Sequence, residues 1–156
     1  MPEMISPHVS YREATQSQTA VRLGLNNTPG PVERTAMELV ARHCYEPIVA
    51  HFGIEPYISS FYRSAKVNAA VGGAAKSQHR TGEAIDIDCD VYGGITNGAL
   101  FRWLKDNVEY DQIIWEFGTA SNPEWVHISY SATRNRHTLL KAVRIKGVTS
   151  YLPWTP

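Results

Sequence analysis

The sequence lacks an excess of charge of either sign. Its 156 residues include 15 basic and 15 acidic side chains, which gives a formal net charge of zero. Proteins that bind nucleic acid usually carry a surplus of lysine and arginine, because these side chains neutralise phosphates. We therefore expect no nucleic acid among the partners of this chain.

Long apolar runs and cysteines are also scarce. No stretch reaches the roughly 18 consecutive apolar residues that a membrane-spanning helix needs. The first residues contain no basic segment followed by an apolar one, as a secretory signal would. We expect a protein without a membrane segment that is cytoplasmic as synthesised and stays there unless another factor releases it. The two cysteines, Cys44 and Cys89, form no CxxC pair, and we expect both thiols to be reduced.

What the sequence does contain is typical of one globular domain. Domains usually have about 100–200 residues, and a chain of this length can bury a hydrophobic core without disulfides. The hydrophobic fraction of 43% and the charged fraction of 19% are ordinary for a globular protein. We find no internal repeat, low-complexity tract or linker, so we expect a single domain over residues 1–156 and a monomer.

The hydrophobic pattern predicts helices first and strands afterwards. Ser10 and Glu13 form a capping-box pattern at the start of a short helix. Apolar residues at helical spacing predict a long helix over residues 32–52, which Pro47 should bend or end early. The other expected elements are helices at 64–71 and 97–108 and strands at 57–61, 84–88, 112–117, 125–130 and 139–151. This order predicts an α+β fold, an antiparallel sheet with flanking helices.

Two segments carry side chains that could bind a metal ion. In Ser77–Asp86 (SQHRTGEAID), His79 lies in a predicted loop and Asp86 on a predicted strand, and His127 lies on another strand. Two imidazoles and one carboxylate leave the fourth position of a zinc ion open, which is the catalytic form of zinc coordination. Asp88 points to the same side of its strand as Asp86, so either could be the ligand. Each histidine could also be an ordinary loop or core residue.

A water molecule bound to such a metal needs a base to take its proton, and Glu124 is the candidate. It lies three residues before His127, from where a carboxylate could take a proton from the water. On a regular strand, residues 124 and 127 would point to opposite faces. Glu124 must therefore lie on the bend before the strand, where Pro123 indicates a turn. The alternative is an exposed turn residue.

The same segments resemble a known family. Ser77–Asp86 matches, at every fixed position, the SxHxxGxAxD motif of the zinc D-Ala-D-Ala carboxypeptidase family. That family also includes D,D-dipeptidases and phage L-alanoyl-D-glutamate endopeptidases, on a fold shared with the hedgehog signalling domain. Residues 125–129 (WVHIS) resemble its second motif, and residues 60–64 (SFYRS) resemble its SGYRS-like segment, with Phe61 in place of the usual glycine. Residues 68–73 resemble the compact phage or prophage branch.

The resemblance covers about residues 55–130 and implies a role for individual residues. It implies one Zn²⁺ per chain, held by His79, Asp86 and His127. It implies that Glu124 is the general base, that Arg63 binds substrate or stabilises the oxyanion, and that Ser77 hydrogen-bonds near the substrate. Arg63 could instead be a surface arginine at the end of a strand, and Ser77 could simply cap a loop.

These residues predict zinc-dependent hydrolysis of peptidoglycan stem peptides, first of all as a D-Ala-D-Ala carboxypeptidase. The alternative within the enzyme class is an L-Ala-D-Glu or cross-bridge endopeptidase of the phage endolysin type, because the sequence does not show whether the cleft is closed past the scissile bond. The alternative from another class is a non-catalytic, zinc-holding module that binds the wall or a partner. Glu124 argues against that module, since a structural zinc ion needs no base.

Overall fold

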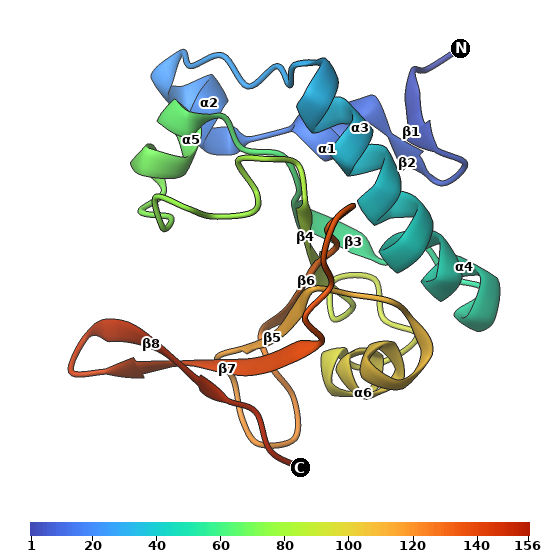
Figure 1. The fold of residues 1–156 in the computed structure, drawn as a ribbon, viewed down its shortest axis with the longest axis vertical. Coiled ribbons are helices and arrows are strands. Elements are labelled where there is room, and N and C mark those ends of the chain that lie inside the picture. Colours follow the sequence, from blue (N-terminus) through green and yellow to red (C-terminus); the bar gives the residue numbers. More distant parts are fainter.

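The computed structural model describes residues 1–156, with most helices before most strands (Figure 1). The helical segments are α1 (Tyr11–Thr15), α2 (Gln18–Leu23), α3 (Pro31–Val40), the π-helical η1 (Ala41–Tyr45), α4 (Glu46–Phe52), α5 (Ala65–Ala70) and α6 (Asn97–Asn107). The strands are β1 (Met4–Ser6), β2 (Val9–Ser10), β3 (Tyr57–Ser60), β4 (Ala84–Asp88), β5 (Gln112–Glu116), β6 (Trp125–Ser129), β7 (Thr138–Ile145) and β8 (Val148–Pro153). None of the helices combines the length and the apolar character that crossing a membrane requires.

The main sheet has six strands in the order β3-β4-β6-β5-β7-β8, and β1 and β2 form a separate two-stranded ribbon. The predicted α+β class is confirmed, but one pair of strands, β5 and β7, is parallel, so the sheet is mixed. The cause is the path of the chain after β6. Ser129 at the end of β6 pairs with Gln112 at the start of β5, and the short loop that follows returns Thr138 to the other side of Gln112. The new strand therefore runs in the same direction as β5.

The C-terminal segment forms two strands where the sequence pattern predicts one. β7 and β8 make an antiparallel hairpin in which Ile145 pairs with Val148. The two residues between them, Lys146 and Gly147, both have positive φ, at 52° and 78°. Positive φ at both central positions is the geometry of a type I′ turn, whose twist suits a two-residue hairpin loop. The Lys-Gly pair was the available signal for this turn.

The predicted long helix is present, and Pro47 does not end it. Helices α3 and α4 continue through η1, where the amide of Glu46 donates to the carbonyl of Ala41, one residue further back than in an α-helix. Pro47 has no N–H group and its ring crowds the preceding turn. A single wider π turn before Pro47 accommodates the ring and lets the helix continue.

The hydrophobic core lies on the side of the sheet where α3, α4 and α6 pack (Figure 1). Alternate residues of the central strands point into it, including Ile85 and Ile87 of β4 and Val126 and Ile128 of β6. The residues between them, such as Asp86, face the opposite side of the sheet. The core therefore fixes which side chains the other face presents. The core also contains both cysteines, which are unpaired.

Candidate metal centre

Three buried side chains, His79, Asp86 and His127, lie together on the face of the sheet opposite the core. We call them the metal cluster; one potential ligand atom from each lies within 4.8 Å of the others. Asp86 and His127 are directly paired across β4 and β6. His127 Nδ1 is 3.0 Å from Asp86 Oδ1, and His79 Nε2 is 3.2 Å from Asp86 Oδ2. The pairing of two neighbouring strands thus positions two members, and a loop brings the third.

The tautomer of His79 favours metal binding. Its Nδ1 lies 2.6 Å from the backbone oxygen of Phe61, and a carbonyl oxygen can only accept, so Nδ1 carries the hydrogen in the neutral ring. The other nitrogen, Nε2, then presents a lone pair to the cluster. This atom is buried and has no hydrogen-bond partner. A buried polar atom without a partner is costly, and a metal ion would satisfy it. The residues present therefore fit a zinc ion.

The loop before β4 holds His79 in place through a close turn. Gly82 has φ of 78°, and a Cβ at this position would collide with the backbone oxygen of Glu33 and lie 2.9 Å from Cγ of Met37. Only glycine allows this approach of the loop to α3. Ser77 contributes from the other end of the loop, where its hydroxyl accepts from the amide of His79 at 3.2 Å. Ser77 also lines the cleft described below.

The carboxylate of Asp86 lies among basic side chains. Burial alone would raise its pKa, but the interactions with the imidazoles of His79 and His127 outweigh burial and hold the pKa of Asp86 well below its usual range. Arg63 Nη2 lies 3.8 Å from Asp86 Oδ2, so the predicted substrate-binding arginine does reach the cluster. Its guanidinium is also held by Ser60 Oγ at 3.3 Å and Asn68 Oδ1 at 3.1 Å.

Asp88 lies on the same strand face as Asp86 but is not part of the cluster. Its Oδ1 accepts from the side-chain amide of Asn97 at 3.0 Å and from the backbone amide of Asp90 at 3.1 Å. These bonds cap the turn that follows β4. The end of the strand turns Asp88 towards Asn97 of α6, so of the two aspartates only Asp86 lies with the two histidines.

The structure does not bring Glu124 to the metal cluster. Glu124 does lie on a bend before β6, as the pattern requires, and its amide donates to the backbone oxygen of Glu116 at 2.9 Å. Its side chain, however, is exposed and does not line the cleft around the cluster. The bend before β6 therefore leaves the side chain of Glu124 in solvent.

Glu116, unlike Glu124, lines the cleft and lies on the sheet face that carries the metal cluster. Ile114 of β5 pairs with His127, and Glu116 is two residues further along the same strand, so its side chain points to the same face. It is only 6% exposed. Burial raises the pKa of Glu116 to about 7; the positive charges of His127 and Arg63 lower it, and the charge of Asp86 raises it. The signal in the sequence is a glutamate that directly follows the three apolar residues 113–115 of the strand.

A comparison with known protein families agrees with this geometry. A sequence model of the Peptidase M15 family matches residues 7–129. The chain belongs to the peptidase M15 family. The resemblance found in the motifs is thereby confirmed, and the match begins well before residue 55, where the motif resemblance starts. A comparison with curated proteins finds no match. As an M15 peptidase, the chain is a metallopeptidase that acts on a peptide.

The metal cluster of this M15 peptidase opens into a cleft of about 1150 Å³. Drug-sized ligands occupy pockets of about 300–1000 Å³, so the cleft has room for a peptide of several residues. Its walls come from parts of the chain that are far apart in sequence: the loop around residues 71–78, the loop around residues 131–136, and the hairpin of β7 and β8. The strands β4, β5 and β6 carry the cluster between these walls.

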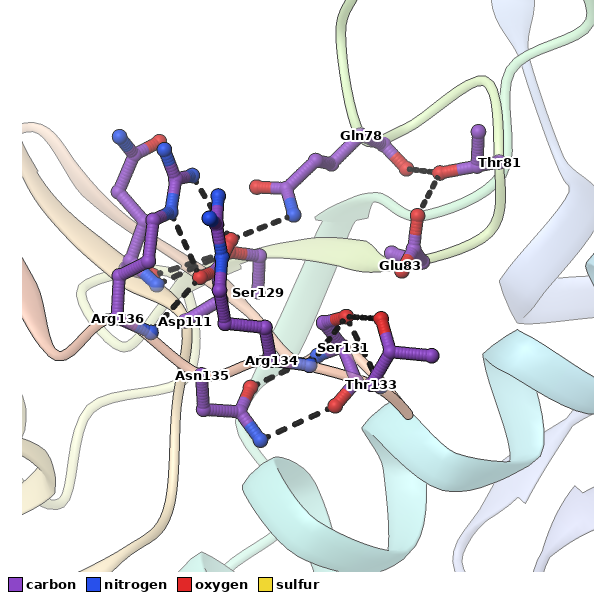
Figure 2. Close-up of polar contacts among 11 residues, drawn as sticks. Gln78, Thr81, Glu83, Asp111, Ser129, Ser131, Thr133, Arg134, Asn135 and Arg136 are labelled. Atoms are coloured by element: carbon purple, nitrogen blue, oxygen red, sulfur yellow. Dashed lines mark hydrogen bonds and ion pairs between the residues drawn. The ribbon is translucent and has the colours of Figure 1, made fainter.

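Asp111 joins the two loops that border the cleft (Figure 2). Its carboxylate accepts from Nε and Nη2 of Arg136, each at 2.9 Å, and from the side-chain amide of Gln78 at 2.9 Å. Gln78 is the neighbour of His79, so the network ties the metal-cluster loop to the loop after β6. The side-chain hydrogen bond from Arg136 holds the pKa of Asp111 down, at about 2.

Proposed function

We propose that this M15 peptidase is a zinc-dependent hydrolase of peptidoglycan stem peptides. The observation that carries the proposal is a buried His-Asp-His cluster, with an unpartnered His79 nitrogen, on the floor of a cleft that also holds the buried Glu116. A metal that served only to stabilise the fold would normally have a closed shell of four protein ligands. This cluster supplies three and opens to a peptide-sized space.

His79, Asp86 and His127 would hold one Zn²⁺, because imidazole nitrogens and a carboxylate oxygen are ligands that zinc prefers. When bound there, zinc supplies Lewis-acid chemistry that activates a water molecule and polarises the scissile carbonyl. The protein's own part is to fix the donor atoms beforehand. Pairing of β4 with β6 fixes two of them, and the hydrogen bond from His79 to the Phe61 carbonyl orients the third.

Glu116 takes the role of general base that the sequence reasoning gave to Glu124. Its position, on the strand next to His127 and on the same face, is the argument for this assignment. Glu116 accepts the proton of the attacking water and then delivers it to the amine of the leaving fragment. Arg63, held beside Asp86, provides positive charge for the developing oxyanion or for a terminal carboxylate of the substrate.

Two cleavage modes share this chemistry. A cation close to the cluster, Arg63, suits the free C-terminus of a D-Ala-D-Ala peptide, which favours the carboxypeptidase. The large cleft, with walls on several sides of the cluster, has room for chain on both sides of the scissile bond and favours an endopeptidase that cuts L-Ala-D-Glu or a cross-bridge. Mass spectrometry of the fragments released from purified peptidoglycan separates the two, because only the first releases free D-Ala.

The decisive experiment compares Glu116→Gln with Glu124→Gln under matched zinc loading. The amide keeps the shape of the side chain but cannot accept the proton at neutral pH. General-base catalysis is worth about 10²–10⁴-fold, so Glu116→Gln should lower the rate on muropeptides by that factor, while Glu124→Gln should stay close to wild type. A large loss in Glu124→Gln alone would refute the reassignment. If zinc-loaded wild type cuts no muropeptide at all, the non-catalytic binding module becomes the better explanation.

A further inference from the structure

The hairpin of β7 and β8 extends the cleft beyond the part of the chain that matches the family, which ends at residue 129. Its orientation follows from the strand register. Glu116 of β5 pairs with Ala142 of β7, and Ala142 pairs with Tyr151 of β8. These three residues form one row across the sheet, so Tyr151 shares the face of Glu116. Arg144 and Thr149, which pair with each other two residues further along, share this face as well.

Arg144 is a cleft arginine without an anionic partner. Of the other arginines that line the cleft, Arg63 pairs with Asp86 and Arg136 pairs with Asp111, while Arg134 also has no carboxylate partner. Arg144 has no carboxylate within 4.0 Å in the whole chain, and its guanidinium Cζ lies 3.9 Å from the centroid of the Phe117 ring. Stacking on an aromatic face fixes the plane of the guanidinium and leaves its edge free. That edge is the fork that binds a carboxylate through two parallel hydrogen bonds.

The backbone of Phe117 holds the ring on which Arg144 stacks. Phe117 has φ of 56°, the left-handed region that residues with a Cβ seldom adopt, and its amide donates to the carbonyl of Ala142 at 3.0 Å. The bond keeps the ring beside β7, directly under the guanidinium. Two residues with hydroxyl groups share this face of β8: Thr149 pairs with Arg144 across the hairpin, and Tyr151 is two residues further along the strand. Burial and the charges of Glu116 and Asp86 raise the pKa of Tyr151, so its hydroxyl keeps its proton and can donate.

We propose that Arg144, with the hydroxyls of Thr149 and Tyr151, forms a subsite that binds a carboxylate of the substrate other than the group that is cleaved. The proposal rests on the proposed function, because it takes the substrate to be a wall stem peptide. Strand spacings place the Cα of Arg144 about 8 Å from that of Glu116. An extended peptide covers this distance in two to three residues, so the recognised carboxylate belongs to a residue close to the scissile bond.

The test uses a stem peptide with free carboxylates and the same peptide with its carboxylates amidated. Binding of both is measured by calorimetry on the Glu116→Gln protein, in which hydrolysis is suppressed, and on the same protein carrying Arg144→Gln. Hydrogen bonds to charged groups contribute enough for about a tenfold difference in affinity. Arg144→Gln should weaken binding of the acid form about tenfold and leave the amidated form unchanged. Arg144→Lys, which keeps the charge but loses the fork, should lie between.

Arg134→Gln is the matched control, because Arg134 also lines the cleft without a carboxylate partner but on the loop after β6. It should leave the preference for the acid form intact. Hydrolysis of both peptides by proteins that retain Glu116 is measured in parallel. If the peptides are cleaved with a preference for the acid form and Arg144→Gln does not change this preference, the subsite is overturned and the proposed function stands. If binding shows a preference for the acid form that depends on Arg144 but no peptide is cleaved, the subsite stands and the proposed function is overturned. If the protein neither binds nor cleaves the peptides, both the subsite and the proposed function are overturned.

Discussion

Replacing Asp111 by asparagine should destabilise the protein at neutral pH and have little effect near pH 2. The side chain of Asp111 is 4% exposed, and Arg136 Nη2 lies 2.9 Å from its Oδ2. Asparagine preserves the shape but leaves the guanidinium without a carboxylate. It also weakens the bond from Gln78, which holds the loop beside His79. The perturbation therefore probes the link between the two loops that border the cleft.

The size of the effect follows from the pKa of Asp111, which the side-chain hydrogen bond from Arg136 lowers to about 2 in the folded protein. In an unfolded chain the pKa is about 3.9, and each pKa unit corresponds to about 1.4 kcal/mol, so the full difference is about 2.5 kcal/mol. Arg136 is 44% exposed, and solvent screens the pair, so we expect about 1–2 kcal/mol. For a chain of this length that is a fall in Tm of about 2–8 °C.

The sign of the pH dependence is fixed by the direction of the shift. Because the pKa of Asp111 is lower in the folded than in the unfolded chain, its carboxylate stabilises the fold fully above about pH 4–5. This stabilisation is lost as the pH falls through about 2. Thermal unfolding of the metal-free wild type and Asp111→Asn between pH 7 and pH 2 should show the two Tm values converging as the pH falls. Metal-free protein is needed because bound zinc would add its own stabilisation.

The control for this prediction is Asp106→Asn, which breaks an ion pair on the surface. Lys105 Nζ lies 2.8 Å from Asp106 Oδ1, but the aspartate side chain is 64% exposed. Exposed pairs contribute about 0–1 kcal/mol, so this variant should unfold close to wild type at every pH. A destabilisation of Asp111→Asn that is the same at pH 7 and pH 2, or no larger than that of Asp106→Asn, would refute the reasoning.

Three further predictions concern the metal, the loop turn and the thiols. Asp86→Ala should lose bound zinc in elemental analysis while Asp88→Ala retains it, because only Asp86 belongs to the metal cluster; the reverse result would move the ligand by two residues. Gly82→Ala should lower the free energy of unfolding by at least about 2 kcal/mol in urea titration, since it combines left-handed strain with a collision against α3, and a neutral result would show that the loop relaxes. Burial raises the pKa of Cys89 to about 12 and raises that of Cys44 further, so both thiols should resist alkylation at pH 8 until the protein is unfolded.

The parts of the site that the sequence predicts are those encoded by neighbouring residues. The order of His79, Gly82 and Asp86 along ten residues defines a loop, a turn and a strand, and the alternation of β4 places Asp86 away from the core. The structure brings these residues and His127 together as the motifs indicate. The distances between them, however, depend on the pairing of Asp86 with His127, and no local pattern states which residues of two separate strands will be opposite.

Glu116 and Glu124 show that closeness to His127 in sequence does not predict closeness to it in space. Glu124 is close to His127 in sequence, and this proximity together with the resemblance to the family makes it the candidate. Glu116 is eleven positions away from His127 but one strand away in space, because β5 and β6 are antiparallel neighbours. The parallel pairing of β7 with β5 was missed for a related reason. It depends on where the loop after β6 returns to the sheet, which is a property of the assembled sheet and not of the loop residues.

The hairpin of β7 and β8 joins the rest of the sheet only along β5. The metal cluster and Glu116 all precede it in the chain, within the residues that the family shares. The proposed catalytic residues and the proposed carboxylate subsite therefore lie in separate stretches of the chain. On the proposed assignments, a chimaera that exchanges residues 138–153 for the corresponding hairpin of another M15 peptidase should retain the cluster and Glu116, and should take over the other protein's preference for the peptide bound on this side of the cleft.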